Sequence, residues 1–260
     1  MAPIRRALVR RPTARLAEGL LTHLDRRPVD VALALAQWEG YVTAMADHGW
    51  DVLEVPPSPE HPDAHFVEDA VVLHRGLAVI GRAGTPERLG EERGVAATLR
   101  GLGYPTVAIE GPGSLEGGDV LQVGRTVYVG RSTRTTPGAV GQLRAALAPR
   151  GADVVAVPTP RALHLKSALC ALPDGTIVGH SPLVGDPSFF PHYLHVPEAL
   201  GAPLVDLGEG RVLMSAAAPE TAALFADRGY EVIGVDISEF EKLEGCVTCL
   251  SVRLRETPEA

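Results

Sequence analysis

The chain has 260 residues, 45% of them hydrophobic, and a formal net charge of −8 at pH 7. This length suits one large domain or two small ones, and the acidic balance argues against a nucleic-acid partner, which normally requires a basic face. Three cysteines cannot all pair, which excludes a disulfide-stabilised scaffold and favours a reducing, cytoplasmic setting. No apolar run approaches the ~18 residues of a membrane helix, so no membrane partner is expected.

Four segments, taken in chain order, share a glycine-containing helix end followed by a β-branched strand. They are HGWDVLEVP (48–56), LGYPTVAIE (102–110), RGADVVAVP (150–158) and RGYEVIGVD (228–236). A helix is predicted before each strand. The first helix is indicated by apolar residues at spacings of four and three, Val31, Leu35, Trp38, Val42 and Met45. The other three are predicted to begin at a proline, in Thr85-Pro86, Thr136-Pro137 and Ala218-Pro219.

Hairpins are predicted before the last three helices, in AVVLHRGLAVIGR, DVLQVGRTVYVGR and VDLGEGRVLMS. A further hairpin, ALCALPDGTIVGH, turns at Pro173-Asp174-Gly175. The repeated unit is therefore strand–strand–helix–strand, present four or five times. One unit cannot bury its own sheet, whereas units around an axis bury one another, so we expect a propeller-like α/β ring with outer helices. The alternative, a doubly wound Rossmann sheet, lacks its signature, because GPGSLEGGD breaks G-x-G-x-x-G with Glu116 and leads into a strand.

Chemically useful side chains follow the repeated strands at comparable places. They are, in order, Glu68 with Asp69, then Glu116, His164 and Cys249. Glu116 and His164 even fall at the same offset, seven residues after the end of their strands. Because equivalent positions of a ring converge on its axis, we expect these side chains to meet in one central acidic pocket.

A cysteine, a histidine and carboxylates together are the residue types that nucleophilic catalysis uses. A free thiol has a pKa of ~8.5, and neighbouring carboxylates make its ionisation harder still. A cationic substrate such as a guanidinium or amidinium would pair with the carboxylates and favour the thiolate. The charge pattern therefore predicts a small cationic substrate.

Each of these residues also has a structural interpretation. Cys249 lies in an apolar strand, where a buried cysteine often acts as a small hydrophobic residue, and His164 lies between leucines. Glu116 precedes two glycines and suits a turn, and Glu68 with Asp69 suits a surface. The shared repeat position favours the catalytic interpretation of the set.

Two further interpretations remain open at this stage. HPDAHFVED brings His61, Asp63, His65, Glu68 and Asp69 together and could hold a metal, although zinc sites usually have tighter spacings. Cys246-x-x-Cys249 could be a metal site, a redox pair, or one catalytic cysteine beside a second cysteine that has no catalytic role. Redox motifs of this spacing normally open a helix, whereas VTCLSVRL alternates like a strand, so oxidation of Cys249 by Cys246 is expected only as an inactivating side reaction. Capture of zinc by Cys249 with His164 is a related possibility.

Five short motifs, found in order over nearly the whole chain, are FVEDAVV, LEGGDVLQVG, VYVGRSTRT, HLKSAL and GCVTCLSV. Together they resemble the dimethylarginine dimethylaminohydrolase family of the guanidine-modifying (amidinotransferase/deiminase) superfamily. The resemblance implies one catalytic domain over residues 1–260 with the five-bladed α/β propeller, or pentein, fold. It implies hydrolysis of Nω,Nω-dimethylarginine and Nω-methylarginine to citrulline plus dimethylamine or methylamine, without a cofactor or a metal.

The resemblance also implies roles for the central residues. Cys249 would attack the guanidinium carbon, and His164 would protonate the leaving amine and then activate water to break a covalent thiouronium intermediate. Glu116 would orient His164. Asp69 would hydrogen-bond the guanidinium nitrogens, and Glu68 would line the pocket.

The amino-acid end of the substrate would be held by a second set of residues. The resemblance assigns Arg88 and Arg134 to the α-carboxylate, and Asp63 with the backbone of Leu20 to the α-amino group. Leu20 would then belong to a mobile lid, ARLAEGL. For both arginines the structural alternative is a solvated surface charge.

The residue two positions after the histidine bears on substrate choice. Arginine deiminases, which resemble this chain, have an acid there, in an H-L-D pattern, whereas this chain has His164-Leu165-Lys166. A cation at this position should not bind the unsubstituted nitrogens of a guanidinium group as an acid would. This difference favours methylated arginine as the substrate. The alternatives are a deiminase-like hydrolase of another guanidine and a non-catalytic ribosome-binding module, as in a translation initiation factor on the same fold. A homodimer is compatible with the apolar outer helices.

Overall fold

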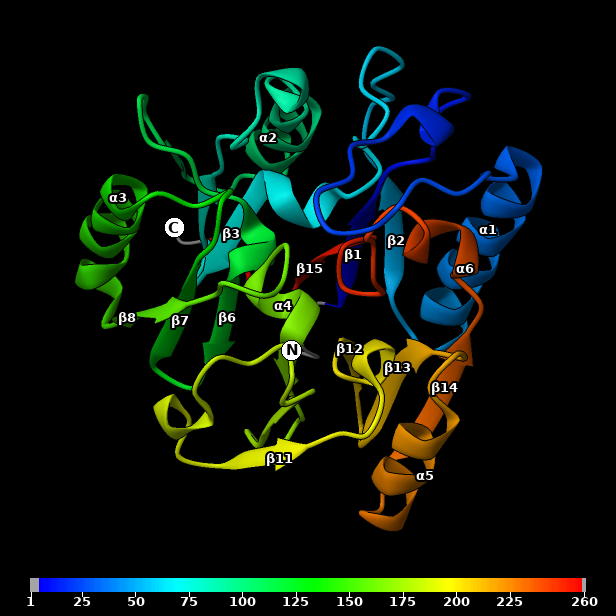
Figure 1. Ribbon diagram of the computed structural model, residues 1–260. Coiled ribbons are helices and arrows are strands. Elements are labelled where there is room, and N and C mark those ends of the chain that lie inside the picture. The colour runs from blue at the N-terminus through cyan, green and yellow to red at the C-terminus, as the bar shows by residue number, and fades with distance from the viewer. Residues whose placement is uncertain (1–4, 259–260) are drawn as a thin grey trace.

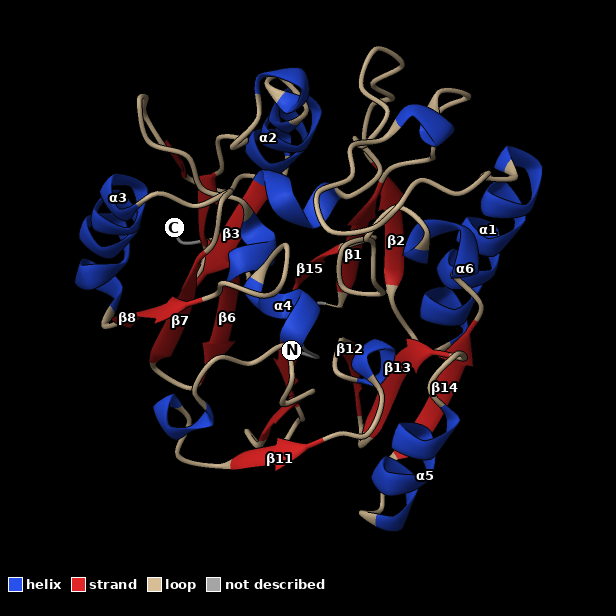
Figure 2. Cartoon of the chain, in the orientation of Figure 1, coloured by secondary structure: helices blue, strands red, loops and turns tan. Residues whose placement is uncertain are grey.

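Fifteen strands form five three-stranded sheets within residues 5–258, the part of the chain that the computed structural model describes (Figures 1 and 2). The strands are β1 (Arg6–Val9), β2 (Asp51–Glu54), β3 (Val71–His74), β4 (Leu77–Ile80), β5 (Thr106–Ala108), β6 (Val120–Val123), β7 (Thr126–Arg131), β8 (Asp153–Pro158), β9 (Leu169–Ala171), β10 (Ile177–Gly179), β11 (Tyr193–His195), β12 (Leu204–Gly208), β13 (Arg211–Ser215), β14 (Glu231–Val235) and β15 (Val252–Leu254).

Six α-helices and seven 3-10 helices connect these strands in the described residues. The α-helices are α1 (Val31–Asp47), α2 (Glu92–Gly101), α3 (Pro137–Leu147), α4 (Leu165–Ala168), α5 (Pro219–Asp227) and α6 (Ser238–Glu241). The 3-10 helices are η1 (Leu16–Glu18), η2 (Val67–Ala70), η3 (Pro86–Arg88), η4 (Gly117–Asp119), η5 (Ala148–Arg150), η6 (Pro187–Phe189) and η7 (Ala199–Gly201).

Every sheet has the same pairing, a central strand that pairs antiparallel with one neighbour and parallel with the other. The sheets stand around a common centre, with α1, α2, α3 and α5 on the periphery (Figure 1). The ring is closed by the two ends of the chain, because β1 pairs antiparallel with β15, with Arg6 opposite Leu254, and parallel with β2. The five-bladed α/β propeller is thereby confirmed.

Three peripheral helices, α1, α3 and α5, begin where the sequence predicts. Asp30 caps α1, its side chain accepting the Leu33 N–H at 3.0 Å, and Thr136 caps α3 immediately before Pro137. Trp38 and Met45 of the predicted face of α1 are fully buried. The burial of α1 is centred slightly off the expected stripe, since Val31, Leu35 and Val42 are only partly buried while Ala34, Gln37 and Tyr41 are buried.

Two units depart from the predicted pattern. The helix expected from Pro86 is split into η3 and α2, because Gly90 adopts a positive φ of 108° that a continuing helix cannot contain. In the fourth sheet, β10 and β11 are joined through the short η6 without an α-helix (Figure 2). The strand–strand–helix–strand unit is therefore complete in four of the five blades.

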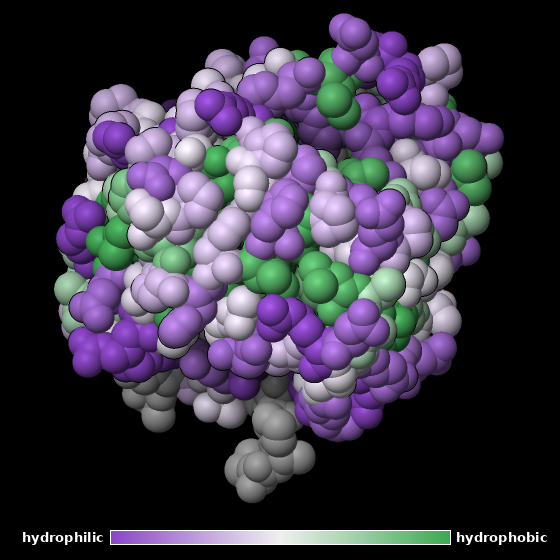
Figure 3. Space-filling view, turned by 60° about the horizontal axis from the view of Figure 1, so that its bottom comes forward, coloured by the Kyte–Doolittle hydropathy of each residue, from purple (hydrophilic) through white to green (hydrophobic). Residues whose placement is uncertain are grey.

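The apolar core is divided among the blades into four clusters, each packed between a sheet and its neighbours. Burial of these side chains supplies the main driving force for folding. The surface in Figure 3 is largely hydrophilic, with apolar residues in small scattered groups. Among the described residues, no helix combines the length and apolar character that crossing a membrane requires.

Candidate active site

Four residues predicted to converge are brought to the centre of the ring by the segments that follow β2, β5, β8 and β14. Asp69 lies in η2, Glu116 and His164 immediately precede η4 and α4, and Cys249 lies in the turn before β15. All four are buried, with 1% to 7% of their surface exposed. Asp69, His164 and Cys249 line one small cavity of about 20 Å³, and Glu116 contacts His164 from behind.

His164 is held by two carboxylates. Its Nε2 lies 2.6 Å from Oε2 of Glu116, and its Nδ1 lies 3.8 Å from Oδ1 of Asp69. Burial disfavours the charged ring, but Asp69 and the hydrogen bond to Glu116 outweigh it and raise the pKa of His164 to about 9. The imidazole is therefore a cation at neutral pH, with Nδ1 as the ring nitrogen not engaged by Glu116.

Cys249 is flanked by a second thiol and by negative charge. Its Sγ lies 3.3 Å from Sγ of Cys246. The contact with Cys246, burial and the charges of Glu68 and Asp69 together raise the pKa of Cys249 well above its ordinary value. This direction favours the protonated thiol in this arrangement, as the acidic pocket predicts.

A glycine allows the histidine and the aspartate to approach each other. A Cβ atom on Gly118 would lie 2.7 Å from Oδ1 of Asp69 and 2.7 Å from Cγ of His164. The Gly118 N–H donates to Oδ1 of Asp69 at 3.1 Å. The Gly117-Gly118 pair of the LEGGDV motif is therefore required by close approach of backbone to side chains.

Arg88 extends into the same site, and its guanidinium lies on three carboxylates. Its Nη1 is 2.9 Å from Oδ2 of Asp69 and 3.5 Å from Oε2 of Glu116, and its Nη2 is 2.8 Å from Oε2 of Glu91. Burial opposes its charge, but these acids outweigh burial and raise the pKa of Arg88. Arg88 is buried, so it is not a solvated surface charge, and its guanidinium occupies the acidic side of the pocket instead of standing free for a substrate carboxylate.

Arg134 is also buried and is less completely paired. Its Nη2 donates to Oγ1 of Thr22 at 3.0 Å, and its Nη1 lies 3.6 Å from Oε1 of Glu116 without a hydrogen-bond partner among the described residues. An unsatisfied buried guanidinium nitrogen is costly unless an anion meets it. Its place on the cavity wall makes Arg134 a suitable carboxylate contact.

The predicted lid folds over this cavity. The Leu20 N–H donates to Oδ2 of Asp63 at 3.0 Å, and both residues line the cavity. Burial raises the pKa of Asp63 despite the opposing influence of Arg88 and the Leu20 hydrogen bond. Further along, the backbone N–H groups of residues 22–24 all donate to the carboxylate of Glu244. The end of the predicted lid and the residues that follow it, 20–24, are thus attached to the site through Asp63, Arg134 and Glu244.

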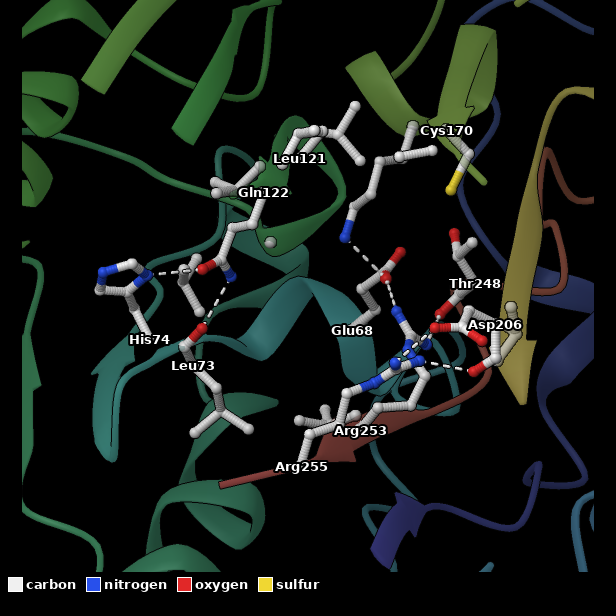
Figure 4. A pocket seen from close by; sticks show the side chains of 18 of the residues that line it. Glu68, Leu73, His74, Leu121, Gln122, Cys170, Asp206, Thr248, Arg253 and Arg255 are labelled. Carbon is white, nitrogen blue, oxygen red and sulfur yellow. Dashed lines mark hydrogen bonds and ion pairs between the residues drawn. The ribbon is translucent and has the colours of Figure 1, made fainter. Parts of the chain in front are cut away.

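Glu68 lies on the other side of the wall formed by these loops. Its Oε1 contacts Nζ of Lys166 at 2.7 Å and Nη2 of Arg253 at 2.6 Å, and its Oε2 is buried without a partner among the described residues. These three residues line a second cavity of about 420 Å³, in which Figure 4 shows Glu68 beside Arg253. Glu68 and Lys166 therefore do not line the cavity that contains Cys249.

Asp69, Glu116 and His164 are also the one group among residues 5–258 whose ligand atoms could surround a metal ion, lying within 4.8 Å of one another. The guanidinium of Arg88 already contacts both carboxylates, so the protein supplies its own cation there. The HPDAHFVED segment gathers no such group. His61 is bonded to Ser58 and Leu89, and His65 is buried against aromatic rings.

Comparison with known proteins gives a consistent result. No protein-family model matches the chain. A dimethylarginine dimethylaminohydrolase of Streptomyces coelicolor is 58% identical over 254 residues, 98% of each chain, and one of Pseudomonas aeruginosa is 34% identical over 251 residues, 95% of this chain and 98% of that one. The chain belongs to the dimethylarginine dimethylaminohydrolase family. A cysteine-to-serine mutant of the Pseudomonas aeruginosa protein complexed with citrulline superposes with a TM-score of 0.89 at 33% identity, over 96% of this chain and 99% of that one.

Three residues of this dimethylarginine dimethylaminohydrolase family member were not singled out from the sequence. Glu91 holds Arg88, and its signal is the Arg-x-x-Glu spacing that allows an i,i+3 pair. Asp119 accepts the Leu165 N–H at 2.9 Å and fixes the turn after His164, and it lies within the conspicuous GGD sequence. Glu244 binds the lid across more than 200 residues of chain, and no local pattern indicates this contact.

Proposed function

We propose that the protein hydrolyses Nω-methylated arginines to citrulline and an alkylamine through a thiouronium intermediate on Cys249. The observation that carries this proposal is the guanidinium of Arg88 on Asp69, 2.9 Å away, in the cavity that Cys249 and His164 line. The site therefore already binds a guanidinium beside a thiol and an imidazolium. A substrate guanidinium would take this place, and Arg88 would move toward the amino-acid end.

Binding of the cationic substrate prepares the nucleophile. The charges of Asp69 and Glu68 disfavour the Cys249 thiolate in the present arrangement. A guanidinium whose carbon faces Sγ brings positive charge closer to the sulfur than Arg88 does, lowers the pKa of the thiol and is itself the electrophile. Charge-assisted hydrogen bonds to Asp69 hold it in line, which limits reaction to cations of this shape.

His164 then serves as acid and as base. As an imidazolium it donates a proton to the departing dimethylamine or methylamine, so that the C–N bond breaks and the S–C bond remains. The neutral ring next takes a proton from water, which attacks the thiouronium carbon, and breakage of the S–C bond releases citrulline and the thiolate. Glu116 positions the ring through Nε2 and stabilises its charge throughout.

The amino-acid end fits the lid side of the cavity. The Nη1 of Arg134, which has no hydrogen-bond partner among the described residues, suits an α-carboxylate, and the buried carboxylate of Asp63 suits an α-amino group beside the backbone of Leu20. Arg88 joins Arg134 on the carboxylate once it leaves Asp69. The apolar side chains of Phe66, Leu163 and Leu243 complete the wall and suit N-methyl groups.

Substrate choice follows from what is missing near His164. The position that holds a second acid in deiminases is Lys166, whose amine is directed to Glu68 in the other cavity. No second carboxylate from this position grips the guanidinium, which leaves room for methyl groups. We place the reaction in a reducing compartment, because three cysteines cannot all pair in disulfides.

The test is citrulline release from purified protein offered dimethylarginine, monomethylarginine, arginine and agmatine side by side, without added metal. We expect release from the two methylated substrates, little from arginine, and none from a Cys249→Ser variant. Preference for arginine would retain the chemistry but overturn the substrate choice. Absence of turnover with all four would leave a different guanidine or a non-catalytic role.

A further inference from the structure

The second cysteine of the site has no part in the proposed hydrolysis, yet it touches the first. Sγ of Cys246 lies 3.3 Å from Sγ of Cys249 and 3.3 Å from Oγ1 of Thr248. Both cysteines are more than 90% buried. Two sulfur atoms at this separation are in van der Waals contact, with no atom between them.

The backbone between the two cysteines already has the geometry that a disulfide needs. The Cys249 N–H donates to the Cys246 carbonyl at 3.1 Å, which closes a four-residue turn. Such a turn keeps its end Cα atoms under about 7 Å apart, and disulfides join Cα atoms roughly 4.4 to 6.8 Å apart. Bond formation therefore needs the sulfur atoms to approach each other by about 1 Å, a motion that χ1 rotation can supply.

Cys249 borders the cavity under the lid, although both cysteines keep similarly small exposed fractions, 6% for Cys249 and 7% for Cys246. It lines the cavity of about 20 Å³, whereas Cys246 does not. A cavity of that size admits a molecule about as large as water or hydrogen peroxide, while a substrate requires the lid to open. An oxidant of this size can thus reach Sγ of Cys249 even under the closed lid.

We propose that Cys246 and Cys249 are a modification site at which a hydroperoxide closes an intramolecular disulfide. The Cys249 thiol gives up its proton as its sulfur attacks one peroxide oxygen, the O–O bond breaks, and the leaving hydroxide takes up that proton as water. Sγ of Cys246 then attacks the resulting sulfenic acid, the S–O bond breaks, and the second hydroxide leaves as water with the Cys246 proton. In sum, two thiols and one peroxide give one disulfide and two waters. The disulfide removes the nucleophile, and a thiol reductant restores it.

The neighbouring thiol also determines the outcome of oxidation. A sulfenic acid without a resolving thiol proceeds to sulfinic acid, which thiols do not reduce. Cys246 converts Cys249 to a reversible product before that step. Cys170 cannot substitute, because it lies on β9, lines the opposite cavity and donates to the Leu204 carbonyl.

The test uses the full-length protein and peptide masses after treatment with hydrogen peroxide, alkylation and trypsin. Cleavage after Lys242 and Arg253 gives one peptide, residues 243–253, that contains Cys246 and Cys249 and excludes Cys170. We expect this peptide to lose two hydrogens and to resist alkylation. Activity should be lost in parallel, and both changes should be reversed by dithiothreitol. A Cys170→Ser control should behave in the same way.

In a Cys246→Ser variant the same peptide should instead gain oxygen atoms, and activity should not recover after prolonged exposure. Oxygen addition on the wild-type peptide without loss of two hydrogens would overturn the proposal, whether or not the variant folds. The mass measurement does not depend on turnover, so the proposed hydrolysis and the disulfide can fail separately.

Discussion

His164 and Glu116 form a buried pair in which Nε2 and Oε2 are 2.6 Å apart, although 48 residues separate them in the chain. Each follows the third strand of its blade, β8 or β5, so the repeat itself brings them together. The pair holds the imidazole ring and keeps it charged, and it fixes the nitrogen that faces the cavity.

Replacement of Glu116 by Gln should change the pH dependence of the reaction. The folded-state pKa of His164 is raised to about 9, so its acid form persists through neutral pH and is lost as the pH rises through that value. Removing the charge of Glu116 lowers the pKa of His164 and moves the alkaline limb of the kcat profile to lower pH. The value of kcat should fall roughly 10- to 1,000-fold. An unchanged alkaline limb would show that His164 is not the acid. Glu220→Gln, at an exposed position of α5, is the matched control.

Replacement of Asp69 by Asn should move two quantities in opposite directions. Turnover should fall about 100-fold or more, because the guanidinium loses its charged acceptor. Alkylation of Cys249 by iodoacetamide should nevertheless shift to lower pH, because Asp69 is one of the charges that raise the pKa of the thiol. Glu91→Gln also weakens the pairing of Arg88 but should leave the alkylation profile in place. If Asp69→Asn made alkylation harder, the electrostatic account would be wrong.

Arg134 should act on binding more than on chemistry. Arg134→Met should raise KM for dimethylarginine about 10- to 100-fold with a smaller change in kcat, since one buried charge-assisted contact is lost. Any activity toward agmatine, which has no carboxylate, should fall much less. Arg125→Met is the control, because Arg125 is largely exposed. An equal loss of activity toward both substrates would show that Arg134 does not bind the substrate carboxylate.

Gly118→Ala should damage both stability and catalysis. A Cβ atom there would lie 2.7 Å from both Asp69 and His164, and relief of this contact should cost about 1–3 kcal/mol in the free energy of unfolding. Denaturant unfolding together with kcat measures the two effects. Gly141→Ala, inside α3 with nothing within 4 Å of its Cβ position, should be neutral or stabilise the protein by up to about 1 kcal/mol. A fully active, stable Gly118→Ala protein would contradict the close approach.

Glu244 should control the lid. Glu244→Gln weakens the acceptor of three consecutive backbone N–H groups at residues 22–24, so closure should become less favourable and KM should rise roughly 10-fold. Limited trypsin cleavage after Arg26 should become faster, since the Arg27–Pro28 bond resists trypsin, and saturating substrate should slow it again. Identical cleavage rates in the variant and the wild type would show that this carboxylate does not hold the lid.

The ring could be predicted from the sequence because each unit carries its own local signals for where its helix and strands begin and end. Glycine helix ends, helix-starting prolines and hairpin turns recur at equivalent places, and these are local signals. The positions of Asp69, Glu116, His164 and Cys249 followed from that phasing. The fourth blade was less predictable, since its third strand, β11, follows η6 without a helical repeat.

Other parts of the site depend on side-chain direction and on long-range contacts. Neighbours such as Glu68 and Asp69 face opposite cavities, as do Lys166 and His164. Aligning the loops of the repeated units predicts that both members of such a pair lie near the centre, but it does not predict which cavity each side chain faces. Arg88 is the last residue of η3, after which Leu89 is extended and Gly90 adopts a positive φ, and that break is visible only in the backbone angles. Glu244 reaches the lid only once the ring has closed.

The measurement that tests the central claim most directly is the mass of residues 243–253 after rapid acid quench during turnover of dimethylarginine. If Cys249 forms the thiouronium, this peptide will carry the arginine-derived thiouronium group on Cys249 during the steady state. Turnover without any adduct on this peptide, or an adduct on Cys246, would contradict the mechanism.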